Sequence, residues 1–268
     1  MASTNIATLL PLAVQAAIQA GEAIMEVYNA PQAEWEVEHK ADNSPLTLAD
    51  RRSHEVIAQA LAATKIPLLS EEGSRIPYAE RRAWSELWIV DPLDGTKEFI
   101  KRNGEFTVNI ALVRDGNPLM GIIFVPVTRM LYVGSPDGAW RTEVPQGVYA
   151  LPHLCPTPIH AHLRSRPAVV ASRSHLNADT ETFIHNLEQL HPEGIDVVSA
   201  GSSLKFCLVA EGKADYYPRF APTMEWDTAA GHAICQAAGA IVRQANGEPL
   251  CYNRQDLLNP YFLVKAAE

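Results

Sequence analysis

Positions 87–96 of this 268-residue chain read Leu-Trp-Ile-Val-Asp-Pro-Leu-Asp-Gly-Thr. The first four residues form an apolar run of strand length. Pro92 has no backbone N–H to give to a strand ladder, so we expect the chain to leave the sheet there. The pattern therefore predicts that two carboxylates, those of Asp91 and Asp94, are held at a strand end.

The residues around these two acids supply further oxygen atoms. The Leu93 carbonyl lies between the acids, and Thr96 adds a hydroxyl. Gly95 permits an unusual backbone angle or the close approach of a ligand. Hard oxygen ligands of this kind suit a divalent cation, and Mg²⁺ above all. The alternative is a plain surface turn, because Asp, Pro and Gly are all turn formers.

Further acids lie at the ends of other expected elements. Glu71 and Glu72 follow a short strand-like run at 67–70. Asp227 begins a later helical pattern, and Asp50 begins an earlier one. Each has a simpler alternative. Glu71 and Glu72 could be a solvated pair in a loop, Asp227 could simply favour a helix N-terminus, and Asp50 could form a capping box. Four acidic sites at element ends together favour a shared role in cation binding.

Taken in order, three motifs resemble those of a known family. They are Glu71-Glu72, the 91–96 motif and Trp226-Asp227-x-Ala229-Ala230-Gly231. The set is similar to that of the lithium-sensitive, Mg²⁺-dependent phosphomonoesterases, which include inositol monophosphatase and fructose bisphosphatase. The resemblance runs from about residue 5 to residue 262. It implies an α+β fold, a layered α-β-α-β-α sandwich.

Residues outside these motifs narrow the resemblance to one branch. Inositol phosphatases commonly continue Thr96 with a Thr-Asn-Phe-like run, whereas this chain has Lys97-Glu98-Phe99. The segments 171–175, 201–207 and 217–220 resemble those of bacterial 3′(2′),5′-bisphosphate nucleotidases, which are associated with sulfate assimilation. The resemblance implies hydrolysis of the 3′-phosphate of adenosine 3′,5′-bisphosphate to AMP and phosphate. Activity on the sulfated analogue, 3′-phosphoadenylyl sulfate, is not readable from the sequence.

The resemblance also implies a set of metal ligands. Glu71, Asp91 and the Leu93 carbonyl would hold one Mg²⁺. Asp91, Asp94 and Asp227 would hold a second, so that Asp91 bridges the two. A third, weaker ion near Glu71 is an open alternative.

The same resemblance assigns the catalytic groups. Asp50 and Thr96 are similar to the pair that orients and deprotonates a metal-activated water. Glu72 is similar to a second base or water ligand. The backbone N–H groups of Gly95 and Thr96 are available to the phosphate.

The second half of the chain would supply the nucleotide contacts. His175 would stack on or bond to adenine, with an ordinary loop histidine as the alternative. Ser202 and Lys205 would approach the remote phosphate or ribose, unless Lys205 lies on a solvated helix face. Arg219 lies between apolar neighbours and needs an acidic partner or an anion, of which we favour the anion.

Composition limits the partners. The net charge of −9 argues against a nucleic-acid-binding surface. It does not argue against an anionic small molecule, because bound Mg²⁺ reverses the local charge. No pair of the four cysteines has the spacing of a zinc or redox motif, so buried free thiols in a reducing cytoplasm are expected. These are Cys155, Cys207, Cys235 and Cys251.

The N-terminus gives no targeting signal by the usual criteria. Residues 1–5 lack the basic start of a signal peptide, and no apolar run is expected to approach membrane-span length. We expect the apolar spacing from Ile6 to Met25 to belong to a core-facing helix. A cytoplasmic protein follows, with peripheral association at the inner membrane and the oligomeric state both left open.

The pattern of elements divides the chain near residue 150. Residues 1–150 predict helices on a mostly antiparallel sheet that carries most of the metal ligands, with a hairpin at Asp115-Gly116. Residues 151–268 predict an α/β half with the nucleotide-binding residues, and the two halves are expected to form one compact catalytic unit. The expected elements are helices at 5–28, 47–63, 178–190, 203–211 and 227–238, and strands at 35–39, 107–113, 119–125, 129–134, 139–142, 168–171 and 195–198.

Two other functions compete with the nucleotidase. The first is an inositol monophosphatase or a broad sugar phosphatase, against which the Lys97-Glu98-Phe99 run, His175, Lys205 and Arg219 all argue. The second is a non-catalytic, metal-dependent regulatory protein of the same fold. It is disfavoured because all the expected acids and Thr96 are present.

The ligand assignment of Asp94 predicts that Asp94→Asn abolishes turnover and leaves the fold intact. An amide binds Mg²⁺ far more weakly than a carboxylate does, while the size of the side chain is kept. Phosphate release measured over a range of Mg²⁺ concentrations, together with circular dichroism, checks this. Near-normal activity with an unchanged Mg²⁺ dependence would remove Asp94 from the metal site.

Overall fold

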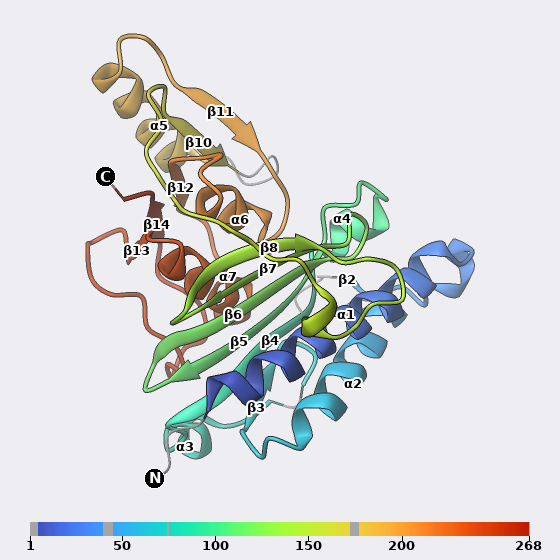
Figure 1. Ribbon diagram of the computed structural model, residues 1–268. Helices are drawn as coiled ribbons and strands as arrows, with labels where there is room; N and C mark the ends of the chain where they lie inside the picture. Colours follow the sequence, from blue (N-terminus) through green and yellow to red (C-terminus); the bar gives the residue numbers. More distant parts are fainter. Residues whose placement is uncertain (1–4, 40–44, 74, 172–176, 268) are drawn as a thin grey trace.

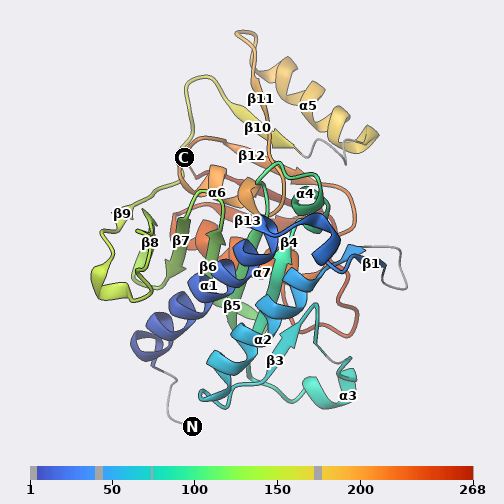
Figure 2. The ribbon, with the colours of Figure 1, turned by 90° about the vertical axis from the view of Figure 1, so that its right-hand side faces the viewer.

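The computed structural model describes residues 5–39, 45–73, 75–171 and 177–267. Its helices and sheets stack in five layers (Figures 1 and 2). In order, the layers are α1 (Ile6–Asn29) with α2 (Leu48–Ala62), a seven-stranded sheet, α6 (Leu204–Ala210) with α7 (Glu225–Ala237), a five-stranded sheet, and α5 (Ala178–Leu190). The expected α+β fold, a layered α-β-α-β-α sandwich, is confirmed.

The seven-stranded sheet separates two apolar cores. One core fills the space towards α1 and α2, and the other fills the space towards α6, α7 and the second sheet. Only the β3–β4 pair is parallel, so the sheet is mostly antiparallel, as predicted. Its strands, in spatial order, are β3 (Leu68–Ser70), β4 (Glu86–Asp94), β5 (Thr107–Arg114), β6 (Asn117–Val125), β7 (Met130–Ser135), β8 (Gly138–Glu143) and β9 (Thr157–Pro158).

The first helix is a core helix. Asn5 caps it by accepting from the backbone N–H of Ala7 at 3.0 Å, and it continues past Pro11. By length and composition α1 could span a membrane, so the expectation that no run approaches that length is wrong. Half of its most apolar stretch is nevertheless buried, and its buried face belongs to the core between α1, α2 and the sheet. Core helices of large domains share this composition.

β4 does not end at Pro92, which corrects the prediction that the chain leaves the sheet there. The strand pairs Asp91 with Asn109 and then Asp94 with Thr107, so it carries one more residue than β5 over this interval. Such a bulge leaves a residue outside the ladder, where the missing N–H of Pro92 removes no hydrogen bond. The strand therefore delivers both acids before the chain turns into α4 (Thr96–Ile100).

The region after α1 also differs from the prediction. The expected strand from Trp35 is reduced to β1 (Glu38–His39), which pairs with β2 (Pro45–Leu46). Trp35 instead ends the short helix η1 (Gln32–Glu34), with its ring buried against Tyr28 and Phe99. Burial of the indole thus overrides the strand-like alternation.

The five-stranded sheet forms the fourth layer. Its order is β11-β10-β12-β14-β13, from β10 (Ala168–Ala171), β11 (Asp196–Ser199), β12 (Tyr216–Arg219), β13 (Ile241–Gln244) and β14 (Phe262–Lys265). β12 contains Pro218 although it is a central strand. β10 pairs with β12 only at Tyr216, so the missing N–H of Pro218 falls beyond that ladder. The remaining short elements are α3 (Tyr78–Arg81) and η2 (Leu151–His153).

Candidate metal centre and adjoining cavity

The β4 bulge is the centre of the acidic site. Asp91 is 1% exposed, and its Oδ1 accepts from the Leu93 N–H at 3.1 Å. Burial raises the pKa of Asp91 well above its usual range, and the negative charges of Glu71, Asp94 and Asp227 raise it further. Asp94, three residues along, and the sequence-distant Glu71 and Asp227 therefore all act on one buried carboxyl.

Asp50 and Thr96 meet, as their predicted roles require. Thr96 Oγ1 donates to Asp50 Oδ1 at 3.1 Å. Asp50 Oδ2 accepts from both the N–H and the hydroxyl of Thr47, at 2.7 and 2.6 Å, and so also forms the capping box of α2. Burial raises the pKa of Asp50 to about 6, with a further contribution from the charge of Glu72.

Asp94 is held by two residues that the sequence did not indicate. Ser203 Oγ donates to Asp94 Oδ2 at 2.6 Å, and Asn109 Nδ2 lies 3.3 Å from the same oxygen. Asn109 also donates to Ser203 at 2.7 Å and accepts from Thr107 at 3.0 Å. Asn109 lies opposite Asp91 on the next strand, so only a correct sheet register could have identified it.

Asp227 lies in the first turn of α7, because the helix begins two residues earlier than predicted. Its Oδ2 accepts from the Met224 N–H at 2.8 Å. Burial raises its pKa, and the nearby charge of Asp94 adds to the effect. The preference of an acid for a helix N-terminus and a role in the acidic site therefore coexist.

Glu71 and Glu72 follow β3 in a turn. The Glu71 N–H donates to the Val90 carbonyl at 3.1 Å, which places Glu71 next to the acidic end of β4. Leu93 has its side chain in the core, while its carbonyl lies 3.4 Å from Thr96 Oγ1. This carbonyl therefore lies on the same side as the Thr96 hydroxyl.

The acids fit a bound cation without forming a ready-made cage. Within the described part of the chain, no three His, Cys, Asp or Glu side chains stand close enough to be a preformed metal site. Among these residues, no Lys or Arg forms an ion pair with Asp91, Asp94 or Asp227. Buried carboxylates that repel one another and lack a basic partner need a cation to stay charged. Oxygen ligands of this kind suit Mg²⁺.

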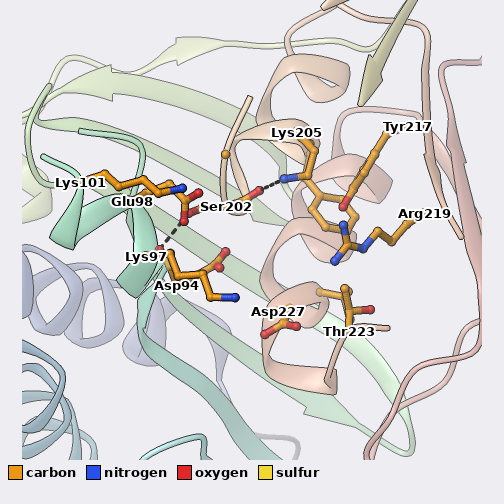
Figure 3. A pocket seen from close by; sticks show the side chains of 14 residues that line it. Asp94, Lys97, Glu98, Lys101, Ser202, Lys205, Tyr217, Arg219, Thr223 and Asp227 are labelled. Carbon is orange, nitrogen blue, oxygen red and sulfur yellow. Dashed lines mark hydrogen bonds between the residues drawn. The ribbon is translucent and has the colours of Figure 1, made fainter. Parts of the chain in front are cut away.

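A cavity of about 350 Å³ opens beside Asp94 and Asp227 (Figure 3). One wall is formed by α4, with Lys97, Glu98 and Lys101, and the other by residues of the second half. Lys97 and Lys101 were not predicted as site residues, although their spacing of four places them on one face of a helix. The cavity thus has acidic groups at one end and cationic groups on both walls.

Lys205 is a buried residue of this cavity, which excludes the solvated helix face. Its Nζ donates to the Ser202 carbonyl at 2.6 Å and lies 5.6 Å from the centre of the Tyr217 ring. Burial lowers its pKa to about 8. The ammonium is therefore held at the cavity wall by a carbonyl and an aromatic face.

Arg219 enters the cavity from the end of β12. Its Nη2 donates to the Pro222 carbonyl at 3.1 Å, and its buried Nε has no hydrogen-bond partner. Within the described part of the chain it forms no ion pair, although its charge lowers the pKa of Asp227. A guanidinium without an ion pair at a cavity wall is suited to an anionic ligand. His175 lies outside the described residues.

Ser202 joins the two halves of the site. Its Oγ lies 2.9 Å from the Asp94 carbonyl and 2.7 Å from the Glu105 carbonyl. A Cβ at Gly95, where φ is +95°, would collide with this hydroxyl. Gly95 is therefore required both by its backbone angle and by the close approach of Ser202.

The sequence matches a known family over nearly its whole length. The model of the "Inositol monophosphatase family" matches residues 5–266. The 3′(2′),5′-bisphosphate nucleotidase CysQ of Shigella flexneri is 47% identical over 259 residues, which cover 96% of this chain and 99% of that protein. The enzyme of the same name from Escherichia coli K12 is 45% identical over 261 residues, with the same coverage.

Solved structures agree with this match. The crystal structure of CysQ from Bacteroides thetaiotaomicron, described as a bacterial member of the inositol monophosphatase family, has a TM-score of 0.85 and 53% identity, with 96% of each chain covered. An inositol monophosphatase from Anabaena has a TM-score of 0.70 at 24% identity, with 98% of this chain and 92% of that chain covered, and shows the fold alone.

The position of Asp50 predicts an acidic limit to activity. As the pH falls through about 6, the carboxylate takes up a proton and Thr96 loses its acceptor, so kcat/KM should fall. Added Mg²⁺ should move this limit to lower pH, because a nearby cation favours the charged carboxylate. Because folding raises the pKa of Asp50, its ionisation lowers the free energy of unfolding, and this loss is complete above a pH of about 6. The protein with ionised Asp50, which is the active form, is therefore less stable than the protonated form.

Profiles of pH against rate for the wild type and Asp50→Asn provide the measurement. The variant should be slow and should lack this limb. An unchanged acidic limb in Asp50→Asn would assign the titration to another group.

Proposed function

The chain belongs to the inositol monophosphatase family, and we propose that it acts as a magnesium-dependent 3′(2′),5′-bisphosphate nucleotidase. It is a phosphatase that hydrolyses the 3′-phosphate of adenosine 3′,5′-bisphosphate to AMP and phosphate. The observation that carries the choice of substrate is the divided charge of the cavity. Acids lie at one end, where a cation and the reacting phosphate would meet, and Lys205 and Arg219 lie beyond them.

A substrate with two phosphates matches this division of charge. The reacting 3′-phosphate would lie against the acidic end, at Asp94 and the N–H groups of Gly95 and Thr96. The second phosphate would then lie on the opposite wall, beside Lys205 and Arg219. Guanidinium and ammonium groups bind phosphate through charge-assisted hydrogen bonds.

Two Mg²⁺ ions fit the acid set. Glu71, Asp91 and the Leu93 carbonyl would hold one, and Asp91, Asp94 and Asp227 the other. Near Glu71 a third is compatible with the acids present. When bound, these ions neutralise the phosphoryl oxygens, lower the pKa of water and stabilise the leaving oxygen.

The protein's own groups then handle the proton. Attack of a water oxygen on phosphorus forms one P–O bond and breaks the bond to the 3′ oxygen, which takes up a proton from solvent and leaves as the 3′ hydroxyl of AMP. The proton of that water passes towards the Thr96 hydroxyl, which donates to Asp50 in turn. Glu72 is the proposed second acceptor, since its charge acts on Asp50.

A small monophosphate would leave most of this cavity unused. An inositol monophosphate has no second phosphate to meet Lys205 and Arg219, so the cavity does not favour it. Free cysteines agree with a reducing cytoplasm, where we place the protein in sulfate assimilation. We also propose that residues 1–150 and 151–268 act as one catalytic unit, because Ser202 and Ser203 bind Asp94 across the division.

One comparison of substrates tests the proposal. Phosphate release from adenosine 3′,5′-bisphosphate should far exceed that from inositol 1-phosphate at equal concentrations, with Mg²⁺ required for both. A preference for the inositol ester would favour the rival phosphatase. No release from either substrate would favour a non-catalytic protein.

The cationic wall predicts a specificity effect. Arg219→Ala and Lys205→Ala should each lower kcat/KM for adenosine 3′,5′-bisphosphate by about 10- to 100-fold, the equivalent of roughly 1.5–3 kcal/mol for a charged hydrogen bond. Neither side chain is proposed to contact the cations or the reacting phosphate, so hydrolysis of a small monophosphate should change far less. Steady-state kinetics on both substrates provides the measurement. Equal losses on both would show that these residues support the fold or the metal site instead.

A further inference from the structure

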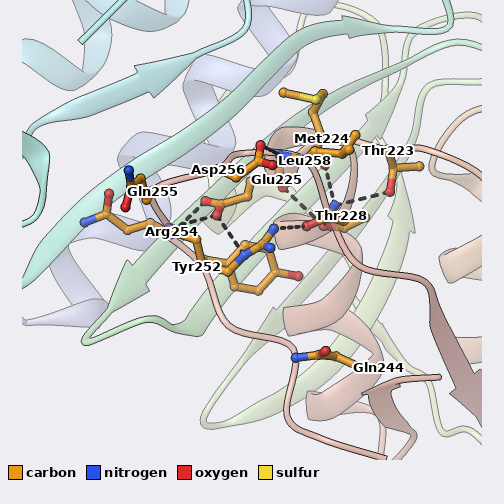
Figure 4. Close-up of polar contacts among 12 residues, drawn as sticks. Thr223, Met224, Glu225, Thr228, Gln244, Tyr252, Arg254, Gln255, Asp256 and Leu258 are labelled. Carbon is orange, nitrogen blue, oxygen red and sulfur yellow. Dashed lines mark hydrogen bonds and ion pairs between the residues drawn. The ribbon is translucent and has the colours of Figure 1, made fainter. Parts of the chain in front are cut away.

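A segment of the second half packs against the start of α7 (Figure 4). We call residues 252–259 the clasp. Its backbone pairs with the residues that lead into the helix, since the Glu225 N–H donates to the Leu257 carbonyl at 3.0 Å and the Asn259 N–H donates to the Thr223 carbonyl at 2.7 Å. The helix start is therefore fixed by residues about 30 positions further along the chain.

Asn259 is the polar centre of this contact. Its side chain is 5% exposed and does not line the cavity. Its Nδ2 lies 2.7 Å from the Met224 carbonyl, 3.0 Å from Thr228 Oγ1 and 3.2 Å from Thr223 Oγ1. Its Oδ1 accepts from Arg254 at 2.9 Å. Both polar atoms of the amide are thus bonded to residues around the start of α7 or to the clasp itself.

The backbone on both sides of Met224 transmits this contact to the acidic site. The Met224 N–H donates to Asp227 Oδ2 at 2.8 Å, and the Thr223 carbonyl in the same peptide plane accepts from the Asn259 N–H at 2.7 Å. The Asn259 amide binds the carbonyl of the next plane, that of Met224, at 2.7 Å. Asn259 therefore holds both peptide planes that meet at the Met224 Cα, and with them the direction of the N–H that binds the Asp227 carboxylate.

Glu225 gives the clasp a second anchor. The side chain is fully buried, and its two oxygens accept from the Asn253 and Arg254 N–H groups at 2.6 and 2.9 Å. Arg254 adds an ion pair at 3.2 Å. Arg81, at the end of α3, binds the carbonyls of Arg254 and Gln255 at 2.6 and 3.0 Å. The clasp is thereby tied to the segment that follows Glu71 and Glu72.

We infer that Asn259 is a positioning residue, which orients Asp227 through the backbone on both sides of Met224 and so sets the cation affinity of the acidic site. The inference rests on the proposed function only in taking Asp227 as a cation ligand. Partners that orient a metal ligand typically change metal affinity by about 10- to 100-fold when they are removed. A purely structural Asn259 would change stability and leave the affinity of the folded protein unchanged.

The test measures Mg²⁺ binding to the substrate-free protein by calorimetry. Asn259→Ala should bind Mg²⁺ about 10- to 100-fold more weakly than the wild type. Its rate should recover at high Mg²⁺, because the carboxylate itself is still present. Asn259→Ser, which keeps a shorter polar group, should fall between the two and serves if the alanine variant does not fold.

Asp215→Ala is the matched control. Asp215 is fully buried and accepts from the Arg164 and Ala168 N–H groups, each at 2.6 Å, so it also joins two segments but does not line the cavity. It should lower Tm and leave Mg²⁺ affinity unchanged. Folded Asn259 variants that bind Mg²⁺ within about twofold of the wild type would overturn the inference.

Calorimetry also separates this inference from the proposed function. A wild type that binds Mg²⁺ but does not hydrolyse adenosine 3′,5′-bisphosphate would refute the nucleotidase and leave the role of Asn259 to be decided by the variants. A wild type that binds no Mg²⁺ would overturn both.

Discussion

The burial of several like charges beside one another is the constraint on which the rest of this structure depends. Asp91 is almost fully buried, and its pKa is raised first by this burial and then by the negative charges of the neighbouring acids. Uncompensated carboxylates in such a place are costly, so the surrounding scaffold must hold them against their mutual repulsion. Two cores, one on each face of the seven-stranded sheet, supply that scaffold.

The acids come from rigid places. Asp50 and Asp227 lie in the first turns of helices, where backbone N–H groups satisfy part of each carboxylate, and Asp94 lies in a bulge braced by Ser203 and Asn109. Asp50, Asp94 and Asp227 therefore all lie in regular secondary structure and not in long loops. The proposed substrate contacts Lys205 and Arg219 come from the second half of the chain, as do Asp227 and the Ser203 that holds Asp94. The proposed cation site and the proposed substrate wall thus share one cavity and depend in part on the same half of the chain.

Local patterns in the sequence were sufficient for much of the fold. The strand at 168–171 and the helix at 178–190 agree with β10 and α5, because each has clear periodicity and clear flanking breaks. The hairpin at Asp115-Gly116 is confirmed by positive φ angles at both residues. The path through Pro92 was wrong, because a bulge depends on the partner strand, which one segment does not reveal.

The acids of the candidate site were predicted from the resemblance of separated motifs to a known family. The predicted pairing of Asp50 with Thr96 is present in the structure as a hydrogen bond. The supporting residues could not be found in the same way. Asn109 and Ser203 are ordinary polar residues within a strand and before a short helix, and only the tertiary register places them beside Asp94. Lys97 and Lys101 were not recognised either, because no helix was predicted at 96–100 and the cavity that they face is completed by the other half of the chain.

The bulge in β4 also has a consequence for how such sequences diverge. Residues three apart in a regular strand face opposite sides, so Asp91 and Asp94 serve one site only because an extra residue lies between their pairing positions. The number of residues in this interval is therefore fixed by the geometry of the sheet. A single insertion or deletion between the two acids would place them on opposite faces of the sheet and divide the site.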